Sequence, residues 1–277
     1  MEKSIVLIIL LSLLSWGNAQ VCHADDLDVL ERLFIKAEKE KWNKLERDSI
    51  LVLVGMELVG TSYVGGTLSQ AKEELIANLD SLDCTTFLEY TLAVTECIKN
   101  ESLHYNSFYE SLAKWRYRNA DVSYSTRLHY FSSFIIEHSL SKRIMDYTEK
   151  LHGRPRKDSV NFMSSHAHLY KGLIDTNALK NIMFEEFRLN QHKRFLIEKS
   201  KVVDLQPKLK SGDIIGFTTS IKGLDFVHVG IIVMNQGQPH LLHASSDKKR
   251  VVISDKTISG YIESNKKQSG IVVLRLL

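Results

Sequence analysis

Apolar residues in the first two thirds of the chain recur at the three- and four-residue spacing of one helix face. Leu30, Leu33, Phe34 and Ala37 form one such stripe near the start. This spacing is typical of amphipathic helices that bury one face. Helices are therefore expected over residues 26–44, 48–59, 84–98, 106–115, 127–137, 164–173 and 176–190, and further helix formers occupy 68–80.

The pattern changes after about residue 195, where short runs of apolar residues are separated by turn signals. Such runs predict strands, and the clearest turn, around Gly237, predicts a hairpin. Strands are expected over residues 214–218, 227–234, 239–244, 250–253 and 271–274, with one earlier strand within 142–150. Helices that precede a sheet favour an α+β fold over alternating α/β units.

The first 19 residues have the pattern of a secretory signal. A basic residue precedes an apolar run over residues 5–14, and the small residues Gly17 and Ala19 follow it. The run is too short to span a bilayer, and no later segment is long and apolar enough to do so. We expect an exported soluble protein, with cleavage after Ala19 or, as the alternative, after Ala24.

Composition and charge narrow the class of protein. Hydrophobic residues make up 44% of the 277 residues and charged residues 25%, which is typical of a globular chain. The net charge is only +3, without a long basic run, so nothing favours a nucleic-acid partner. No repeat or low-complexity linker is found. A single domain is expected over residues 20–277, with a helical lobe at about 26–190 and a β lobe at about 195–277.

A cysteine lies at the predicted start of the third helix. Asp83 is a good N-cap, and Cys84 follows it in the first turn, where the helix dipole favours a thiolate. The pKa of the thiol is therefore expected to be lowered. The alternative is a small buried core residue. Cys97 lies 13 residues along the same helix, about 20 Å away, so the two thiols are not expected to pair.

Two histidines could supply the base that a nucleophilic thiol needs. His228 opens one predicted strand and His243 lies near the end of the next, on either side of a hairpin turn. Such positions lie opposite each other in an antiparallel pair, so both imidazoles can share one face. Cys84, His228 and His243 could then act as nucleophile, general base and orienting group. A half-buried structural role for each histidine stays open, whereas two histidines alone are weak evidence for a metal.

Several motifs together resemble the NlpC-type cell-wall peptidases. They are Asp83-Cys84, Ser211-Gly212-Asp213-Ile214-Ile215-Gly216-Phe217, His228-Val229-Gly230-Ile231 and Leu242-His243-Ala244. Three further segments resemble more closely the N-acetylmuramoyl-L-alanine amidase-like family, over nearly the whole mature chain. They are Tyr63-Val64-Gly65-Gly66-Thr67-Leu68, Leu82-Asp83-Cys84-Thr85-Thr86-Phe87 and Ser125-Thr126-Arg127-Leu128-His129-Tyr130-Phe131. The resemblance implies a papain-like cysteine hydrolase fold, with the nucleophile helix of a helical lobe packed on a C-terminal antiparallel sheet or barrel.

The resemblance also implies roles for individual residues. Cys84 becomes the nucleophile, His228 the general base and acid, and His243 the orienting residue, while Tyr63 lies near the oxyanion site. The backbone N–H of Cys84 is an expected oxyanion donor. Basic residues that could hold a carboxylated peptide stem, or instead form structural ion pairs, are Arg116, Arg118, Arg127 and His129. No cofactor and no metal are expected.

The activity implied by the resemblance is cleavage between N-acetylmuramic acid and L-alanine in peptidoglycan or soluble muropeptides. Two alternatives stay open: an endopeptidase that cuts between D-glutamate and the diamino acid of the stem, and a binding module without catalysis. The intact set of Cys84, His228 and His243 argues against the binding module. A periplasmic monomer is expected.

Overall fold

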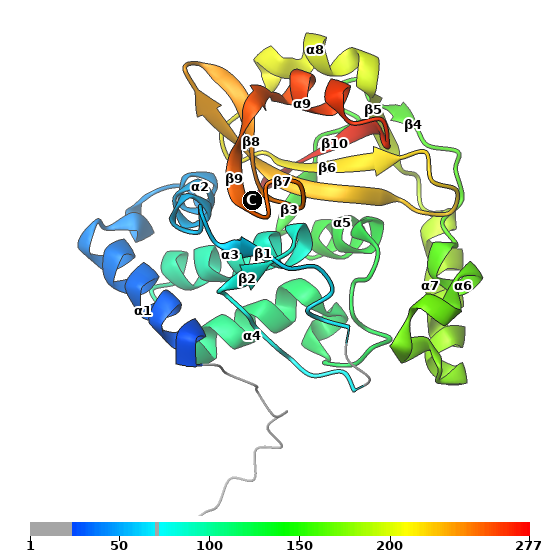
Figure 1. The fold of residues 1–277 in the computed structure, drawn as a ribbon, viewed down its shortest axis with the longest axis horizontal. Helices are drawn as coiled ribbons and strands as arrows, with labels where there is room; N and C mark the ends of the chain where they lie inside the picture. Colours follow the sequence, from blue (N-terminus) through cyan, green and yellow to red (C-terminus); the bar gives the residue numbers. More distant parts are fainter. Residues whose placement is uncertain (1–23, 70–71) are drawn as a thin grey trace, which may run out of the picture.

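The computed structural model describes residues 24–69 and 72–277, in which helices precede most of the sheet (Figure 1). The helices are α1 (Ala24–Lys39), α2 (Arg47–Glu57), α3 (Cys84–Lys99), α4 (Tyr105–Arg116), α5 (Phe131–Leu140), α6 (Phe162–Ser165), α7 (Thr176–Gln191), α8 (Val202–Leu205) and α9 (Ile258–Ser264). The signal predicted over residues 1–19 lies outside the described residues.

The sheet combines a C-terminal antiparallel core with short strands from the helical half. The strands are β1 (Ser62–Tyr63), β2 (Ser81–Leu82), β3 (Ile144–Asp146), β4 (Arg154–Pro155), β5 (Phe195–Glu198), β6 (Ile214–Thr219), β7 (Phe226–Asn235), β8 (Gln238–Ser245), β9 (Arg250–Thr257) and β10 (Gln268–Leu276). Their order is β2-β1-β9-β8-β7-β6-β10-β5-β4, with β3 on β10. The β1–β2 pair is parallel and the other pairs are antiparallel. The curled sheet confirms an α+β fold.

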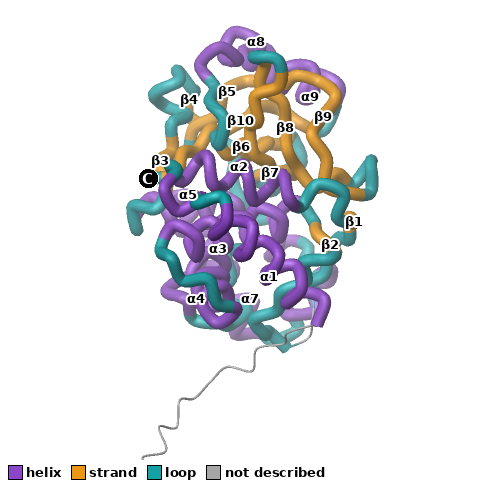
Figure 2. Tube along the Cα trace, turned by 90° about the vertical axis from the view of Figure 1, so that its left-hand side faces the viewer, coloured by secondary structure: helices purple, strands orange, loops and turns teal. Residues whose placement is uncertain are grey.

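Helices cover both faces of the sheet. Alternate side chains of a strand point to opposite sides, and here apolar side chains on both sides are buried. Val229 and Ile231 of β7 pack in the hydrophobic cluster that contains α3. Ile232, the next residue, packs in a second cluster with Ile258 of α9. Figure 2 shows α3 and α4 below the sheet and α8 and α9 above it. The β7–β8 hairpin therefore lies between α3 on one face of the sheet and α9 on the other.

Most predicted helices are confirmed, but two segments differ. The helix expected over 164–173 is reduced to α6, followed by 3-10 turns at Ala167–Leu169 and Lys171–Leu173. The described part of 68–80 contains no helix, although helix formers are common there. Its backbone groups bond elsewhere: Arg127 donates to the carbonyl of Leu68, and Arg116 donates to that of Ile76. Such tertiary contacts outweigh weak helix propensity.

The five C-terminal strands are confirmed and run longer than predicted. Within 142–150 the strand is only β3, because Thr148 turns its amide back to the side chain of Asp146. Cys84 and Cys97 do not pair, as predicted. In the part of the chain that the structure describes, no helix is long and apolar enough to cross a membrane.

Candidate active site

The start of α3 is fixed by a reciprocal pair of hydrogen bonds, as the sequence predicted for Asp83. The carboxylate of Asp83 accepts from the backbone N–H of Thr86 at 2.8 Å, and the hydroxyl of Thr86 accepts from the N–H of Asp83 at 2.9 Å. This capping box satisfies two donors that the helix itself leaves free. Cys84 is the first residue of α3 and is half-buried, so the cap also fixes where its thiol lies.

The pKa of the thiol moves opposite to expectation. Burial raises the pKa of Cys84 to about 12, and the negative charge of Asp83 adds to the effect. Hydrogen bonds from the backbone N–H of Val229, the side chain of Thr85 and its own N–H favour the thiolate but do not compensate. The predicted thiolate is therefore wrong for the resting protein. The contact with Val229 places the sulfur beside the backbone that follows His228.

The two predicted histidines are hydrogen-bonded to each other. Nε2 of His228 lies 2.7 Å from Nδ1 of His243, with the ring planes at 89°. Gly230 lies next to His243 on the neighbouring strand and leaves room for the contact between the two histidines. A Cβ at Gly230 would lie only 3.0 Å from the Cβ of His243. The register of β7 with β8 runs from Asn235↔Gln238 to Ile231↔Leu242. Both imidazoles lie just beyond that paired segment.

Both imidazoles are held neutral. Burial lowers the pKa of His228 to about 3, and the neighbouring His243 lowers it further. Burial also lowers the pKa of His243 to about 4, although a backbone bond at Ala244 and the charge of Asp247 oppose this. With the raised pKa of Cys84, the resting site holds a neutral thiol and neutral imidazoles at pH 7. A neutral imidazole has a lone pair that can accept a proton.

A cleft of about 600 Å³ opens beside the histidine pair. His228 and His243 line it from the sheet, and the ring of Tyr261 on α9 lies 5.2 Å from that of His243, centroid to centroid. The charge of a Cys84 thiolate would raise the pKa of Tyr261, which shows that the sulfur lies within electrostatic range of the phenol. Tyr261 and Gln268, at the start of β10, are cleft residues that the sequence reasoning missed, because neither belongs to a recognisable motif.

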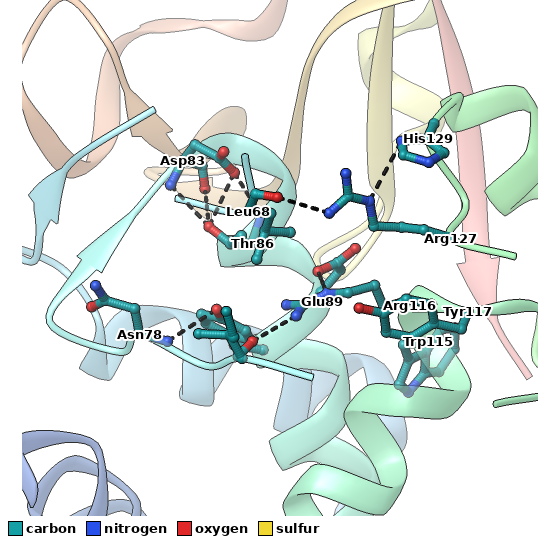
Figure 3. A network of polar contacts seen from close by, with 12 residues as sticks. Leu68, Asn78, Asp83, Thr86, Glu89, Trp115, Arg116, Tyr117, Arg127 and His129 are labelled. Carbon is teal, nitrogen blue, oxygen red and sulfur yellow. Dashed lines mark hydrogen bonds and ion pairs between the residues drawn. The ribbon is translucent and has the colours of Figure 1, made fainter. Parts of the chain in front are cut away.

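Arg116 was a candidate for substrate binding, and the structure corrects this. Its side chain is 0% exposed and lies inside the helical lobe, where Nε donates to Glu89 at 2.7 Å and Nη1 to the carbonyl of Ile76 at 2.6 Å. Figure 3 shows Glu89 on α3, one turn below the Asp83 and Thr86 cap, facing Arg116. No atom of Arg116 reaches a surface on which a substrate could bind, so this residue is structural.

The other three basic candidates also have partners within the protein. Arg118 bridges Glu137 and Glu185, which lie on α5 and α7. Arg127 donates to the carbonyl of Leu68, and its Nε contacts the His129 ring (Figure 3). Arg127 also forms an ion pair with the carboxylate of Glu73, at 3.1 Å. These contacts support the structural alternative for Arg118 and Arg127.

His129 and Tyr63 differ in their surroundings. Nε2 of His129 lies 2.7 Å from the carbonyl of Tyr124, and burial lowers the pKa of His129 to about 3, with the Arg127 charge acting in the same direction. Tyr63 is half-buried and packs against the same hydrophobic cluster as Cys84. Burial raises the pKa of the Tyr63 phenol, and the Cys84 and Asp83 charges add to it. Of the predicted binding residues, Tyr63 is therefore the one placed near the thiol.

Among the described residues, no group of three or more His, Cys, Asp or Glu side chains could hold a metal ion. The chemistry available at the site is that of a thiol, two neutral imidazoles and nearby backbone donors. Such a set can transfer an acyl group by nucleophilic attack and proton exchange.

Comparison with models of protein families identifies the family to which the chain belongs. A family model described as N-acetylmuramoyl-L-alanine amidase-like matches residues 53–271, most of the chain. The chain belongs to this family. Its matched region contains the α3 start, the histidine hairpin and Tyr261. No curated protein matches the chain.

Solved structures agree with the family assignment. An N-acetylmuramoyl-L-alanine amidase from Bacteroides uniformis is 34% identical, with a TM-score of 0.78 over 83% of this chain and 99% of that one. A putative xylanase from Bacteroides fragilis is 35% identical, with a TM-score of 0.74 over 81% of this chain and 100% of that one. A Legionella pneumophila protein at 17% identity shares the fold, with a TM-score of 0.70 over 91% of this chain and 95% of that one.

Proposed function

We propose that this protein is an exported cysteine amidase that hydrolyses the bond between N-acetylmuramic acid and L-alanine in peptidoglycan or muropeptides. The proposal includes a papain-like arrangement in which the helix that carries the nucleophile packs on the sheet that carries the base. The observation that supports it most is the 2.7 Å bond between His228 and His243, because the backbone N–H of Val229, the residue after His228, bonds to the thiol of Cys84. The family membership and the similar amidase supply the substrate class.

The proposed reaction begins from neutral groups. The sulfur of Cys84 attacks the lactyl carbonyl carbon while its proton passes to His228, since a thiol with a raised pKa must lose its proton during attack. His243 holds His228 through Nε2, which leaves Nδ1 as the basic atom. The backbone N–H of Cys84, at the first turn of the helix, and the phenol of Tyr63 are the oxyanion donors that this scheme requires.

Breakdown of the tetrahedral intermediate completes the first half-reaction. The carbon–nitrogen bond breaks, and His228 returns the proton to the departing amine of L-alanine. A thioester between Cys84 and the muramyl lactyl group remains. Water then attacks this thioester with His228 as base, which releases the muramyl carboxylate and restores the thiol.

The cleft argues against carbohydrate chemistry of the kind named for the putative xylanase. Glycoside hydrolysis in most families requires two carboxyl groups on either side of the scissile bond. Among the described residues that line the cleft beside the histidines, Asp247 is the one with a carboxylate. Amide hydrolysis by the thiol therefore fits the cleft better than hydrolysis of a glycosidic bond.

Export to the periplasm is part of the proposal and rests on the signal-like residues 1–19. A monomer is expected to suffice, because Cys84, His228, His243 and the cleft are all contributed by one chain.

Mass spectrometry of the products from purified muropeptides tests the proposal. The mature protein should release free stem peptide and intact sugar, and Cys84→Ala should release neither. Cys97→Ala, which removes the buried thiol further along α3, is the matched control and should keep the activity. A sugar that still carries L-alanine and D-glutamate would instead identify a stem endopeptidase. Binding without any cleavage would favour a binding module and refute the amidase.

A further inference from the structure

A second cleft adjoins the one beside the histidine pair. It has a volume of about 380 Å³ and is lined mainly by β9 and the turn before it. The two clefts share five residues, which are His243, Ser245, Asp247, Tyr261 and Ser264. A substrate held at the histidines can therefore extend from the first cleft into the second.

One basic residue of the second cleft lies close to His243. Arg250, the first residue of β9, pairs with Ser245 of β8, which is two residues along from His243. Arg250 and His243 are therefore diagonal neighbours on one face of the sheet, about 7–8 Å apart. Arg250 also pairs with Ser62 of β1, the residue before Tyr63. The strand that carries this cation thus lies between the strand of His243 and that of Tyr63.

The side chain of Arg250 is exposed and has no carboxylate partner inside the protein. It forms no ion pair with any of the described residues. Of the two aspartates that line the second cleft, Asp247 and Asp255, the latter pairs with Lys248 at 3.4 Å. By contrast, the three arginines that the sequence suggests for substrate binding all pair with carboxylates of the chain. A substrate carboxylate can therefore bind Arg250 without displacing an internal partner.

The charges of the proposed substrate indicate what this cation binds. The lactyl carboxyl group of muramic acid is part of the scissile amide, so the free carboxylates lie in the peptide stem. A guanidinium group matches a carboxylate through two parallel N–H···O bonds. We propose that Arg250 is a substrate-binding residue that holds a carboxylate of the peptide stem in the second cleft. The inference rests on the proposed amidase function, because it assigns the stem of the same substrate to this cleft.

Calorimetric binding of two probes tests the inference. They are N-acetylmuramoyl-L-alanyl-D-glutamate and the analogue in which both carboxylates are carboxamides. The protein carries Cys84→Ala, so that neither probe is consumed. Arg250→Met should weaken binding of the carboxylate probe at least ~5-fold, because an arginine–carboxylate pair covered by bound substrate is stronger than an open surface pair. Binding of the carboxamide probe should be the same with and without this substitution.

Lys256→Met is the matched control, because it removes the same charge from the same cleft at a residue further from His243. Lys256 is exposed, and the next residue, Thr257, pairs with His240 of β8. Exposed charges at a distance are screened by salt. Lys256→Met should therefore leave the binding of both probes unchanged.

The two probes also separate binding from a structural role. An equal loss of affinity for both probes in Arg250→Met would mean that Arg250 supports the shape of the cleft, and would overturn the inference. Equal affinity of the two probes for protein with Arg250, no binding of the carboxylate probe, or an equal effect of Lys256→Met would overturn it too. If carboxylate binding depends on Arg250 but protein with Cys84 intact hydrolyses no muropeptide, the amidase function is refuted and the binding role of Arg250 stands.

Discussion

Replacing Arg116 with methionine tests whether this buried arginine is structural. Arg116→Met keeps an apolar stem of similar length but removes the cation that pairs with Glu89 at 2.7 Å. Glu89 is only 5% exposed, so its carboxylate would remain buried without its main partner. Breaking a buried ion pair in this way costs about 3–5 kcal/mol. That is a large part of the total stability of a typical domain, ~5–15 kcal/mol.

A second substitution, of Glu89, should restore most of the stability that Arg116→Met removes. Arg116→Met combined with Glu89→Leu removes both charges and fills the same space with apolar atoms, which is often neutral or stabilising for a buried pair. The carbonyl of Ile76 loses the Nη1 donor at 2.6 Å, and one unpaired buried acceptor costs about 1–3 kcal/mol. The double variant should therefore lie between the single variant and the wild-type protein in unfolding free energy.

Urea unfolding followed by circular dichroism, on the wild-type protein, both single variants and the double variant, measures the coupling between the two residues. The coupling should exceed about 1 kcal/mol. The KM for muropeptides should be the same in the double variant as in the wild-type protein, because no atom of Arg116 is exposed. Full stability of Arg116→Met together with a raised KM would show that the arginine binds substrate, and our assignment would be wrong.

Two further predictions concern the site itself. Gly230→Ala would place a Cβ 2.9 Å from the carbonyl of Leu242 and 3.0 Å from the Cβ of His243, so it should cost about 1–3 kcal/mol in urea unfolding and lower kcat. Gly260→Ala is the control: a Cβ there has its nearest neighbour at 3.4 Å, so both stability and kcat should be unchanged. A Gly230→Ala variant with full stability and full activity would contradict the role of Gly230 in the contact between His228 and His243. Because the pKa of Cys84 is raised to about 12, its alkylation by iodoacetamide should accelerate steadily from pH 6 to pH 10. A plateau below pH 7 would indicate a resting thiolate instead.

The parts of the site that local sequence specifies were predictable. Asp83 and Thr86 lie three residues apart, so the capping box that starts α3 depends only on neighbours in the chain. The β7–β8 hairpin likewise follows from two apolar runs around one turn, and it brings His228 and His243 together. Local hydrogen bonding thus places Cys84 at the start of a helix, and strand pairing brings the two histidines together, whereas the approach of Cys84 to β7 depends on the packing of α3 against the sheet.

The roles of the arginines were not predictable in the same way. Arg116 pairs with Glu89, 27 residues away, and Arg118 with Glu185, 67 residues away. An isolated basic residue in a sequence gives no sign of which carboxylate it will meet after folding. The helix formers within 68–80 do not build a helix for a related reason, since distant side chains bind the backbone carbonyls of this segment. Long-range polar contacts are the information that a local pattern does not contain.

The thiol shows how two correct physical effects can give a wrong sign when their sizes are not compared. Cys84 does begin a helix, but the helix dipole typically contributes ~0.3–1 kcal/mol, less than one pKa unit. Burial acts in the other direction and raises the pKa from its ordinary value of 9.0 to about 12, a larger change. A thiol in this state gains little from the helix start alone and depends on a base that removes its proton during attack. The hydrogen-bonded His228 and His243 are therefore central to the proposed activity, more so than the position of Cys84 on α3.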